Sequence, residues 1–142
     1  MIESEPPEPR RTLPVVDDEN RIFWTSGANG SLHIRRCGNC GNYIHPPSPR
    51  CPKCLSSNVG DVAVSGRGRI ESFTINHHRW VPNLKVPYVI ALVSLEEQQD
   101  VRLATNIVEC SPESVSIGAK VHVVFEQHED VYLPMFQLEQ PK

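Results

Sequence analysis

Long hydrophobic runs are absent from the 142-residue sequence, and aromatic residues are few. No stretch of about 18 apolar residues occurs, so we expect no membrane-spanning helix. The acidic, proline-rich first residues lack an apolar segment behind a basic start, so we expect no secretory signal and a cytoplasmic protein. The sequence contains 13 Pro but only four Phe, two Trp and three Tyr. This composition disfavours a helical bundle and favours short strands joined by turns.

A large excess of either charge is missing as well, because the net charge is only −3. Residues 31–87 carry eight basic and two acidic side chains, whereas residues 88–142 carry three basic and nine acidic ones. A basic central part between acidic ends suggests one surface that meets an anionic molecule. The negative total does not favour a general nucleic-acid-binding protein.

The cysteines, by contrast, form a distinctive pattern. Four of the five lie in two Cys-x2-Cys pairs that are separated by ten residues: Cys37, Cys40, Cys51 and Cys54. Two residues between cysteines allow a tight turn to direct both sulfurs to one point, so two such turns form the tetrahedral four-sulfur site that Zn²⁺ accepts. Because four sulfurs leave no open position for water or substrate, we expect a structural ion that folds the segment and does not catalyse.

Other uses of the four cysteines remain open. A rubredoxin-type iron centre uses the same tetrahedral set of thiolates. A disulfide framework is disfavoured in a cytosolic protein, and a redox Cys-x2-Cys normally occurs singly and not as a matched pair. His33 and His45 lie close to the cysteines in sequence, but the four sulfurs already complete a site.

Cys110 and the adjacent His77 and His78 are the candidates for a reactive group outside the four-cysteine motif. We interpret Cys110, which follows an apolar stretch, as a half-buried residue at the end of a strand. Adjacent histidines on a strand point to opposite faces, so His77 and His78 do not easily share one site. A stand-alone enzyme that uses any of the three is one hypothesis.

The order of the remaining patterns predicts a mainly β fold. Asp17, Asp18 and Glu19 suit the start of a short helix, whose apolar face carries Phe23 and Trp24. This aromatic pair either fills the core or docks on a partner. In chain order we predict a flexible arm, an N-terminal helix, a zinc ribbon and an OB-fold barrel, at residues 1–16, 17–30, 31–62 and 63–140.

Five runs rich in β-branched and aromatic residues make up the predicted barrel. They cover residues 69–80, 88–95, 101–108, 121–126 and 131–138. We expect a helical turn over residues 111–116, between the third and fourth runs, with Ser111 as its cap and Pro112 at its first position. Five strands with a helical insert after the third are the order of an OB-fold, a small Greek-key barrel.

An ordered set of motifs resembles one protein family over roughly residues 17–138. The set comprises Phe23-Trp24, Arg36-Cys37-x-x-Cys40-Gly41, Pro46-Pro47, Cys51-Pro52-x-Cys54, Ser65-Gly66-x-Gly68, Pro87-Tyr88 and Ile117-Gly118-x-x-Val121. The chain is similar to the acyl-CoA-associated OB-fold proteins with an N-terminal rubredoxin-like zinc ribbon, catalogued as domain of unknown function thirty-five. It departs from the family's pattern after Glu96-Glu97, where Gln98 stands in place of a frequent glycine, so we expect a different turn there.

This resemblance implies a function that the bare residues do not show. Members of the family are commonly small partners of thiolase-superfamily and lipid-transfer-like aldolases that act on acyl-CoA thioesters. By resemblance, we expect a non-catalytic accessory subunit of a hetero-oligomer whose reaction is a retro-aldol cleavage of a steroid side-chain β-hydroxyacyl-CoA. The thiolase-like subunit is then expected to carry the chemistry, and this chain to be a required part of the complex.

Four cations are the candidates for contacting the CoA phosphates or the partner: Arg67, Arg69, Arg79 and Lys85. The planar guanidinium of arginine suits phosphate because it donates two parallel hydrogen bonds. Each of the four is equally compatible with a solvated barrel surface. We expect the Trp80–Pro87 loop to lie near the partner, because it mixes an aromatic residue with basic residues and prolines.

The alternative function is single-stranded nucleic-acid binding, for which OB-folds and zinc ribbons both serve. Phe73, Trp80 and Tyr88 would then stack on bases between cations. We do not expect nucleic acid to be the partner, because the net charge is negative and the last part of the chain is acidic.

Overall fold

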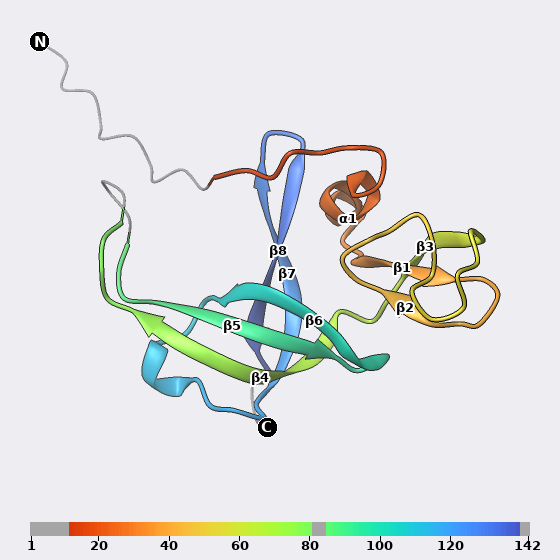
Figure 1. Ribbon diagram of the computed structural model, residues 1–142. Helices are drawn as coiled ribbons and strands as arrows, with labels where there is room; N and C mark the ends of the chain where they lie inside the picture. Colours follow the sequence, from red (N-terminus) through yellow and green to blue (C-terminus); the bar gives the residue numbers. More distant parts are fainter. Residues whose placement is uncertain (1–11, 81–84, 140–142) are drawn as a thin grey trace, which may run out of the picture.

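The computed structural model describes residues 12–80 and 85–139 and has a small three-stranded sheet next to a closed barrel (Figure 1). Among these residues the fold is mostly β, with one short α-helix, a ribbon region and a five-stranded barrel, which confirms the predicted fold class. The elements are α1 (Arg21–Thr25), the 3₁₀ helix η1 (Ser26–Asn29), β1 (His33–Cys37), β2 (Tyr43–Ile44), β3 (Val59–Ala63), β4 (Arg67–Asn76), β5 (Tyr88–Leu95), β6 (Gln98–Ile107), η2 (Pro112–Ser114), β7 (Lys120–His128) and β8 (Val131–Leu138). The boundaries that we predicted for the four units stay predictions.

The ribbon sheet has the order β2-β1-β3, and both strand pairs are antiparallel. Cys37, the first predicted metal ligand, ends β1 and lies opposite Val59 of β3. The sequence analysis did not predict β3 as a strand, because Gly60 and Asp61 interrupt its apolar pattern. β3 is held in place because it pairs with β1 along the whole length of that strand.

The barrel closes in the order β4-β5-β6-β8-β7. Its strand pairs are antiparallel except for β6 and β8, which run parallel at Ile107 and Phe136. Side chains alternate between the interior and the outer surface, as a half-buried strand requires. Along β5, for example, Val89, Ala91 and Val93 are buried, and the residues between them face outward.

The N-terminal segment starts with a turn before the helix. The α-helix begins at Arg21 and not at Asp17, because the Asp17 carboxylate accepts hydrogen bonds from the backbone N–H groups of Glu19 and Asn20 and holds a turn there. Within residues 12–16, Leu13 packs beside the buried cluster of Val131, Leu133 and Met135.

Packing joins the helical segment to both β units. Figure 1 shows α1 between the ribbon strands and the β7–β8 hairpin. Phe23 is buried in the main core, so it fills the core, and Trp24 is half-buried against it at a ring-centroid distance of 4.7 Å. None of the helices in the described part of the chain is long and apolar enough to cross a membrane.

Candidate metal centre and its surroundings

The structure brings the four predicted cysteine ligands together. The sulfurs of Cys37, Cys40, Cys51 and Cys54 all lie within 4.8 Å of one another. The Cys37–Cys54 and Cys40–Cys51 sulfurs are 3.5 Å apart. A tetrahedral site with metal–sulfur bonds of about 2.3 Å places sulfurs about 3.8 Å apart, so the spacing fits one ion.

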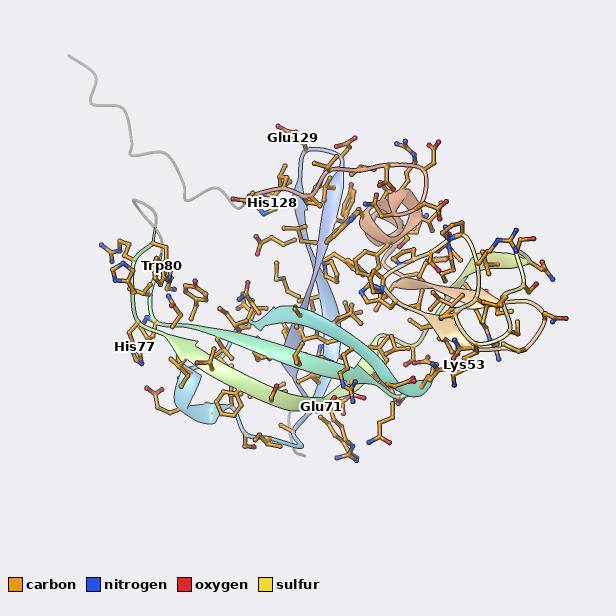
Figure 2. All side chains as sticks on the ribbon, viewed as in Figure 1. Lys53, Glu71, His77, Trp80, His128 and Glu129 are labelled. Carbon is orange, nitrogen blue, oxygen red and sulfur yellow. The ribbon has the colours of Figure 1, made fainter. Side chains whose placement is uncertain are left out.

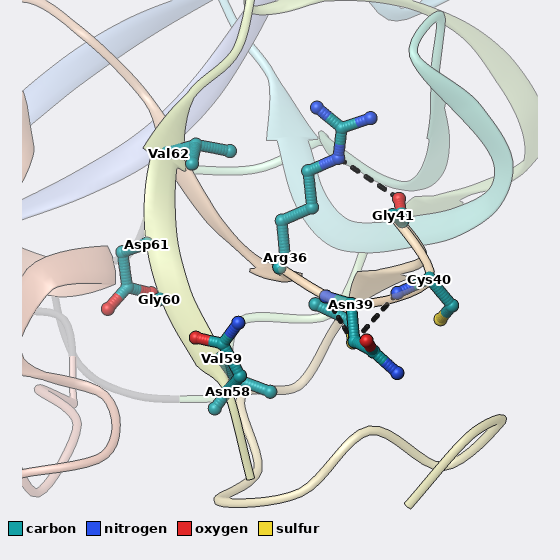
Figure 3. Close-up of a pocket in the computed structure, with 11 residues that line it drawn as sticks. Arg36, Asn39, Cys40, Gly41, Asn58, Val59, Gly60, Asp61 and Val62 are labelled. Carbon is teal, nitrogen blue, oxygen red and sulfur yellow. Dashed lines mark hydrogen bonds between the residues drawn. The ribbon is translucent and has the colours of Figure 1, made fainter. Parts of the chain in front are cut away.

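Two turns of the same shape hold these sulfurs. The backbone N–H of Gly41 donates to the carbonyl of Cys37 at 3.0 Å, and the N–H of Leu55 donates to the carbonyl of Cys51 at 2.8 Å. The N–H of Asn39 donates to the Cys37 sulfur at 3.3 Å. Figure 3 shows the first turn beside β3, with the Arg36 Nε donating to the Gly41 carbonyl at 3.0 Å.

Backbone N–H groups make two of the sulfurs acidic. They lower the pKa of Cys37, with the N–H of Cys40 contributing most, and lower the pKa of Cys51 to about 6, with the N–H of Cys54 contributing most. At Cys40 the N–H of Asn42 favours the thiolate, but burial and the neighbouring cysteine sulfurs raise the pKa to about 11. A divalent cation at the centre would remove this crowding of negative charge. The donor set therefore fits a structural metal ion.

A buried arginine ties the ribbon to the segment before α1. Arg35 of β1 forms an ion pair with Glu19 and donates to the backbone carbonyls of Glu19 and Ser48, each at 3.0 Å. It also approaches the Asp61 carboxylate on β3 at 3.4 Å. These carboxylates and carbonyls compensate the loss of hydration of a guanidinium that is only 8% exposed.

A single glutamine side chain connects the ribbon to the barrel. Gln98, the first residue of β6, accepts a hydrogen bond from the backbone N–H of Tyr43 at 2.9 Å and donates to the Tyr43 carbonyl at 3.2 Å. It also donates to the Asn42 side-chain oxygen at 3.0 Å. The Asn42 amide nitrogen in turn lies 3.9 Å from the Cys51 sulfur. The side chains of Gln98 and Asn42 thus connect the barrel to the cysteine cluster.

Sequence reasoning did not find this connection. The sequence analysis noted Gln98 only because it stands where the similar family often has a glycine. Its partners on the ribbon are 55 and 56 positions away, so no local pattern could have indicated them. Arg35 was missed for the same reason, since Glu19, Ser48 and Asp61 come from separate segments.

Two family models match successive parts of the chain. The rubredoxin-like zinc ribbon domain of ChsH2 matches residues 24–60, and the C-terminal OB-fold domain of ChsH2 matches residues 61–126. A solved structure described as the Ltp2–ChsH2(DUF35) aldolase contains a chain that is 33% identical with a TM-score of 0.80, and the match covers 89% of this chain and 98% of that one. The chain belongs to the ChsH2-type DUF35 family.

Some curated relatives are longer than this DUF35 chain. A probable enoyl-CoA hydratase alpha subunit of Thermomonospora curvata is 34% identical over 132 residues, which make up 92% of this chain and 41% of the relative. The 3-oxo-4,17-pregnadiene-20-carboxyl-CoA hydratase alpha subunit of Mycobacterium tuberculosis is 35% identical over 112 residues, or 79% of this chain and 35% of the relative. The chain therefore spans less than half the length of these relatives.

The DUF35 chain places its four predicted cations in two groups. Arg67 and Arg69 are exposed at the start of β4 and line one cavity together with Lys120 and three glutamates. Arg79 follows β4, and Lys85 precedes β5, at the other end of this hairpin. Because β4 has ten residues, it is about 30 Å long, and the structure does not bring the two pairs together.

The reactive-group candidates do not form a catalytic set in the described residues. Burial raises the pKa of the Cys110 thiol, whereas a nucleophilic cysteine needs a lowered pKa. His77 and His78 follow the end of β4 and are not on a strand, because β4 ends at Asn76. The His78 ring instead contacts the Trp80 ring. Residues 81–84 of the predicted partner-facing loop lie outside the described residues.

Proposed function

We propose that this DUF35 chain is a non-catalytic accessory subunit of a thiolase-like acyl-CoA enzyme, in a hetero-oligomer with the thiolase-superfamily subunit. The reaction that fits best is retro-aldol cleavage of a steroid side-chain β-hydroxyacyl-CoA thioester. The likeness to the chain of the Ltp2–ChsH2(DUF35) aldolase, over nearly the whole of both chains, carries this proposal. A relative named for a pregnadiene-carboxyl-CoA substrate supports a steroid CoA thioester as the substrate class.

The chemistry belongs to the partner in this proposal. In a retro-aldol step the β-hydroxyl loses its proton and becomes a carbonyl, the bond between the α- and β-carbons breaks, and the α-carbon of the released acyl-CoA gains a proton. Such a step needs a positioned base and a positioned acid. In this proposal the thiolase-like subunit supplies that pair, while burial raises the pKa of Cys110 and the His78 ring contacts Trp80.

We assign the two pairs of cations to different contacts. Arg67 and Arg69, with Lys120 beside them in one cavity, are suited to the phosphates of CoA, because two guanidinium groups offer several charge-assisted hydrogen bonds. Arg79 and Lys85 flank the exposed Trp80 end of the barrel and are suited to the partner surface. Each pair can be replaced by Gln independently to test this assignment.

Zinc is the metal that we propose for the four-cysteine site, with iron as the alternative. An all-sulfur tetrahedral site is typical of structural zinc, and the site leaves no open position for a substrate. When bound, the ion supplies folding energy to the ribbon and no chemistry. A cytoplasmic location is consistent with this use, because thiols remain reduced there.

Co-expression tests the proposed function. The full chain is produced with thiolase-superfamily subunits of the same genome, one at a time, and the purified complexes are assayed with a β-hydroxyacyl-CoA. We expect a stable complex that releases a shorter acyl-CoA, and no turnover by this chain alone. Turnover by this chain alone, or failure of every such subunit to bind it, would contradict the proposal.

A further inference from the structure

The outer surface of the β4–β5–β6 sheet has an apolar centre on β5. Ile90 and Leu92 of β5 face outward, and they are 40% and 38% exposed. Thr74 and Asn106 lie on the two sides of Ile90. The partners of Leu92 are small, because Ser72 and Ala104 lie on its two sides. Beside these neighbours the two aliphatic side chains remain partly exposed, so the sheet presents them to the surroundings.

An exposed tryptophan extends this surface. The Trp80 side chain is 69% exposed, yet three contacts hold the segment that carries it. Its indole N–H donates to the Asn76 side-chain oxygen at 2.9 Å, and its ring meets the edge of the His78 ring at a centroid distance of 4.3 Å. The Asn76 amide also donates to the His78 carbonyl at 2.7 Å.

The tryptophan and the apolar strand surface are continuous. Asn76, which holds Trp80, lies directly opposite Tyr88, the first outward-facing residue of β5. Tyr88, Ile90 and Leu92 follow one another on the same side of that strand, over about 13 Å. Figure 2 shows Trp80 at the end of the sheet, far from Lys53 of the ribbon. We call this surface the β5 face; it consists of Ser72, Thr74, Trp80, Tyr88, Ile90, Leu92 and Ala104.

The charges around the β5 face indicate what it contacts. Its seven residues are uncharged. Arg102, at the edge, is paired with Glu71, with the Arg102 Nε 2.6 Å from the carboxylate oxygen. Arg79 and Lys85 lie at the Trp80 end, and Arg69, opposite Ser94, lies beyond Leu92 at the other end. An apolar centre with charges at its rim is the composition of a protein–protein interface.

We infer that the β5 face docks the thiolase-like subunit, with Trp80 as the main anchor at one end. This inference rests on the proposed function, which supplies the identity of the partner. The solved relative is described as the Ltp2–ChsH2(DUF35) aldolase, and this description names a second protein, Ltp2, beside the similar chain. Preordered, exposed tryptophans are enriched among the residues that dominate binding energy, because little conformational freedom is lost when they are buried.

The β5 face is poorly suited to nucleic acid. Single-stranded nucleic acid needs a groove with cations along the backbone path in addition to aromatic platforms. The β5 face supplies aromatic rings at one end, but Ser72, Thr74, Ile90 and Leu92 along its centre carry no cation. The cations near it lie at its two ends and its edge. The docked surface of the partner is therefore expected to be apolar, with acidic residues opposite Arg79 and Lys85.

Three variants of the full chain test the inference. They are Trp80→Ala, the double variant Ile90→Ser/Leu92→Ser, and Asn76→Ala. The last removes the hydrogen bonds that hold the Trp80 side chain but keeps the side chain itself. The matched controls are Ile117→Ser and Val15→Ser, because both residues are exposed apolar side chains outside the β5 face. Each protein is titrated against the thiolase-superfamily subunit that binds the unchanged chain, by calorimetry. Melting temperature and bound metal are measured on the same samples.

We expect Trp80→Ala and the double variant to weaken binding at least about tenfold each, and Asn76→Ala to weaken it less, with unchanged melting temperature and metal content. The two controls should bind as the unchanged chain does. Equal affinity of all five variants would overturn the inference while leaving the proposed function intact. Absence of any binding by the unchanged chain would instead reject the proposed function. Retention of an oligonucleotide that depends on Trp80 would place nucleic acid on this surface and would also overturn the inference.

Discussion

Gly41 and Leu55 occupy equivalent positions in the two cysteine turns of the ribbon. Each donates its backbone N–H to the carbonyl of the first cysteine of its turn, and each has a positive φ, +80° at Gly41 and +65° at Leu55. Glycine adopts this conformation without strain, whereas a side chain with a Cβ atom is disfavoured there. The second turn therefore contains a leucine where the backbone favours glycine.

Replacement of Leu55 by Gly should stabilise the metal-loaded protein by about 1 kcal/mol, because it relieves the strain of the left-handed conformation. The Leu55 side chain is 67% exposed, so little buried apolar contact is lost. Thermal unfolding in the presence of metal measures the effect. The reverse variant Gly41→Leu should lower the melting temperature; if Leu55→Gly also lowers it, the strain argument fails.

Each of the four cysteine ligands should be required for metal binding. Replacement of Cys37 or Cys54 by Ser should abolish stoichiometric metal binding and unfold the ribbon, since structural zinc contributes about 10–16 kcal/mol to folding in small peptides. Elemental analysis should find one zinc per chain in the unchanged protein. Cys110→Ser is the control, because Cys110 lies outside the cluster and should leave the metal content unchanged.

The stability of the protein should decrease in mild acid because of His45. Burial lowers the pKa of His45 below its ordinary value of 6.5, and its Nδ1 atom has no hydrogen-bond partner. The unfolded chain therefore binds a proton near pH 6.5 that the folded chain does not bind. The free energy of unfolding must then fall as the pH decreases from 6.5 toward the lower pKa of the folded state.

His45→Phe is the matched variant for this prediction, because a phenyl ring keeps the ring contact with Phe23, which has a centroid distance of 4.8 Å. Chemical unfolding of both proteins between pH 5 and pH 8, at saturating metal, measures the difference in stability. Loss of metal in acid affects both proteins and cancels in this difference. A difference that does not change with pH would show that His45 does not titrate on unfolding.

Gly27 lies where the helical segment meets the β7–β8 hairpin. A Cβ atom at this position would lie 2.6 Å from the Cβ atom of Tyr132 and would also clash with the Phe125 ring. Gly27→Ala should therefore destabilise the protein by about 1–3 kcal/mol. Gly60→Ala is the control, because nothing lies within 4 Å of its Cβ position and it should be close to neutral. Urea unfolding compares the two variants.

Gln98→Ala should weaken the junction between the ribbon and the barrel. The variant leaves the partly buried N–H and carbonyl of Tyr43 without their partners, at an expected loss of about 1–3 kcal/mol. Gln99→Ala, at an exposed neighbouring position, should change stability by less than about 0.5 kcal/mol. Hydrogen exchange at the Tyr43 amide reports directly on the junction, and unchanged protection of this amide in Gln98→Ala would contradict the prediction.

Local patterns in the sequence were sufficient to indicate the four cysteines that the structure brings together and most of the barrel strands. The two Cys-x2-Cys pairs indicated the ligands because each turn directs its own sulfurs, and the structure needs only to bring two turns together. Residues 88–95 and 131–138 were predicted with the observed bounds of β5 and β8, because their side chains are dominated by apolar and β-branched types.

Only the tertiary structure decided the features that depend on distant segments. The strand β3, the buried Arg35 and the Gln98 junction exist because separate parts of the chain pair there. The sequence analysis treated Arg67, Arg69, Arg79 and Lys85 as one set of cations, but the length of β4 separates the first two from the last two. The exposure of Trp80, Ile90 and Leu92 also follows from folding alone. The physical reason is that a sequence pattern reports preferences of neighbouring residues, whereas hydrogen bonds and burial depend on which residues the fold brings into contact.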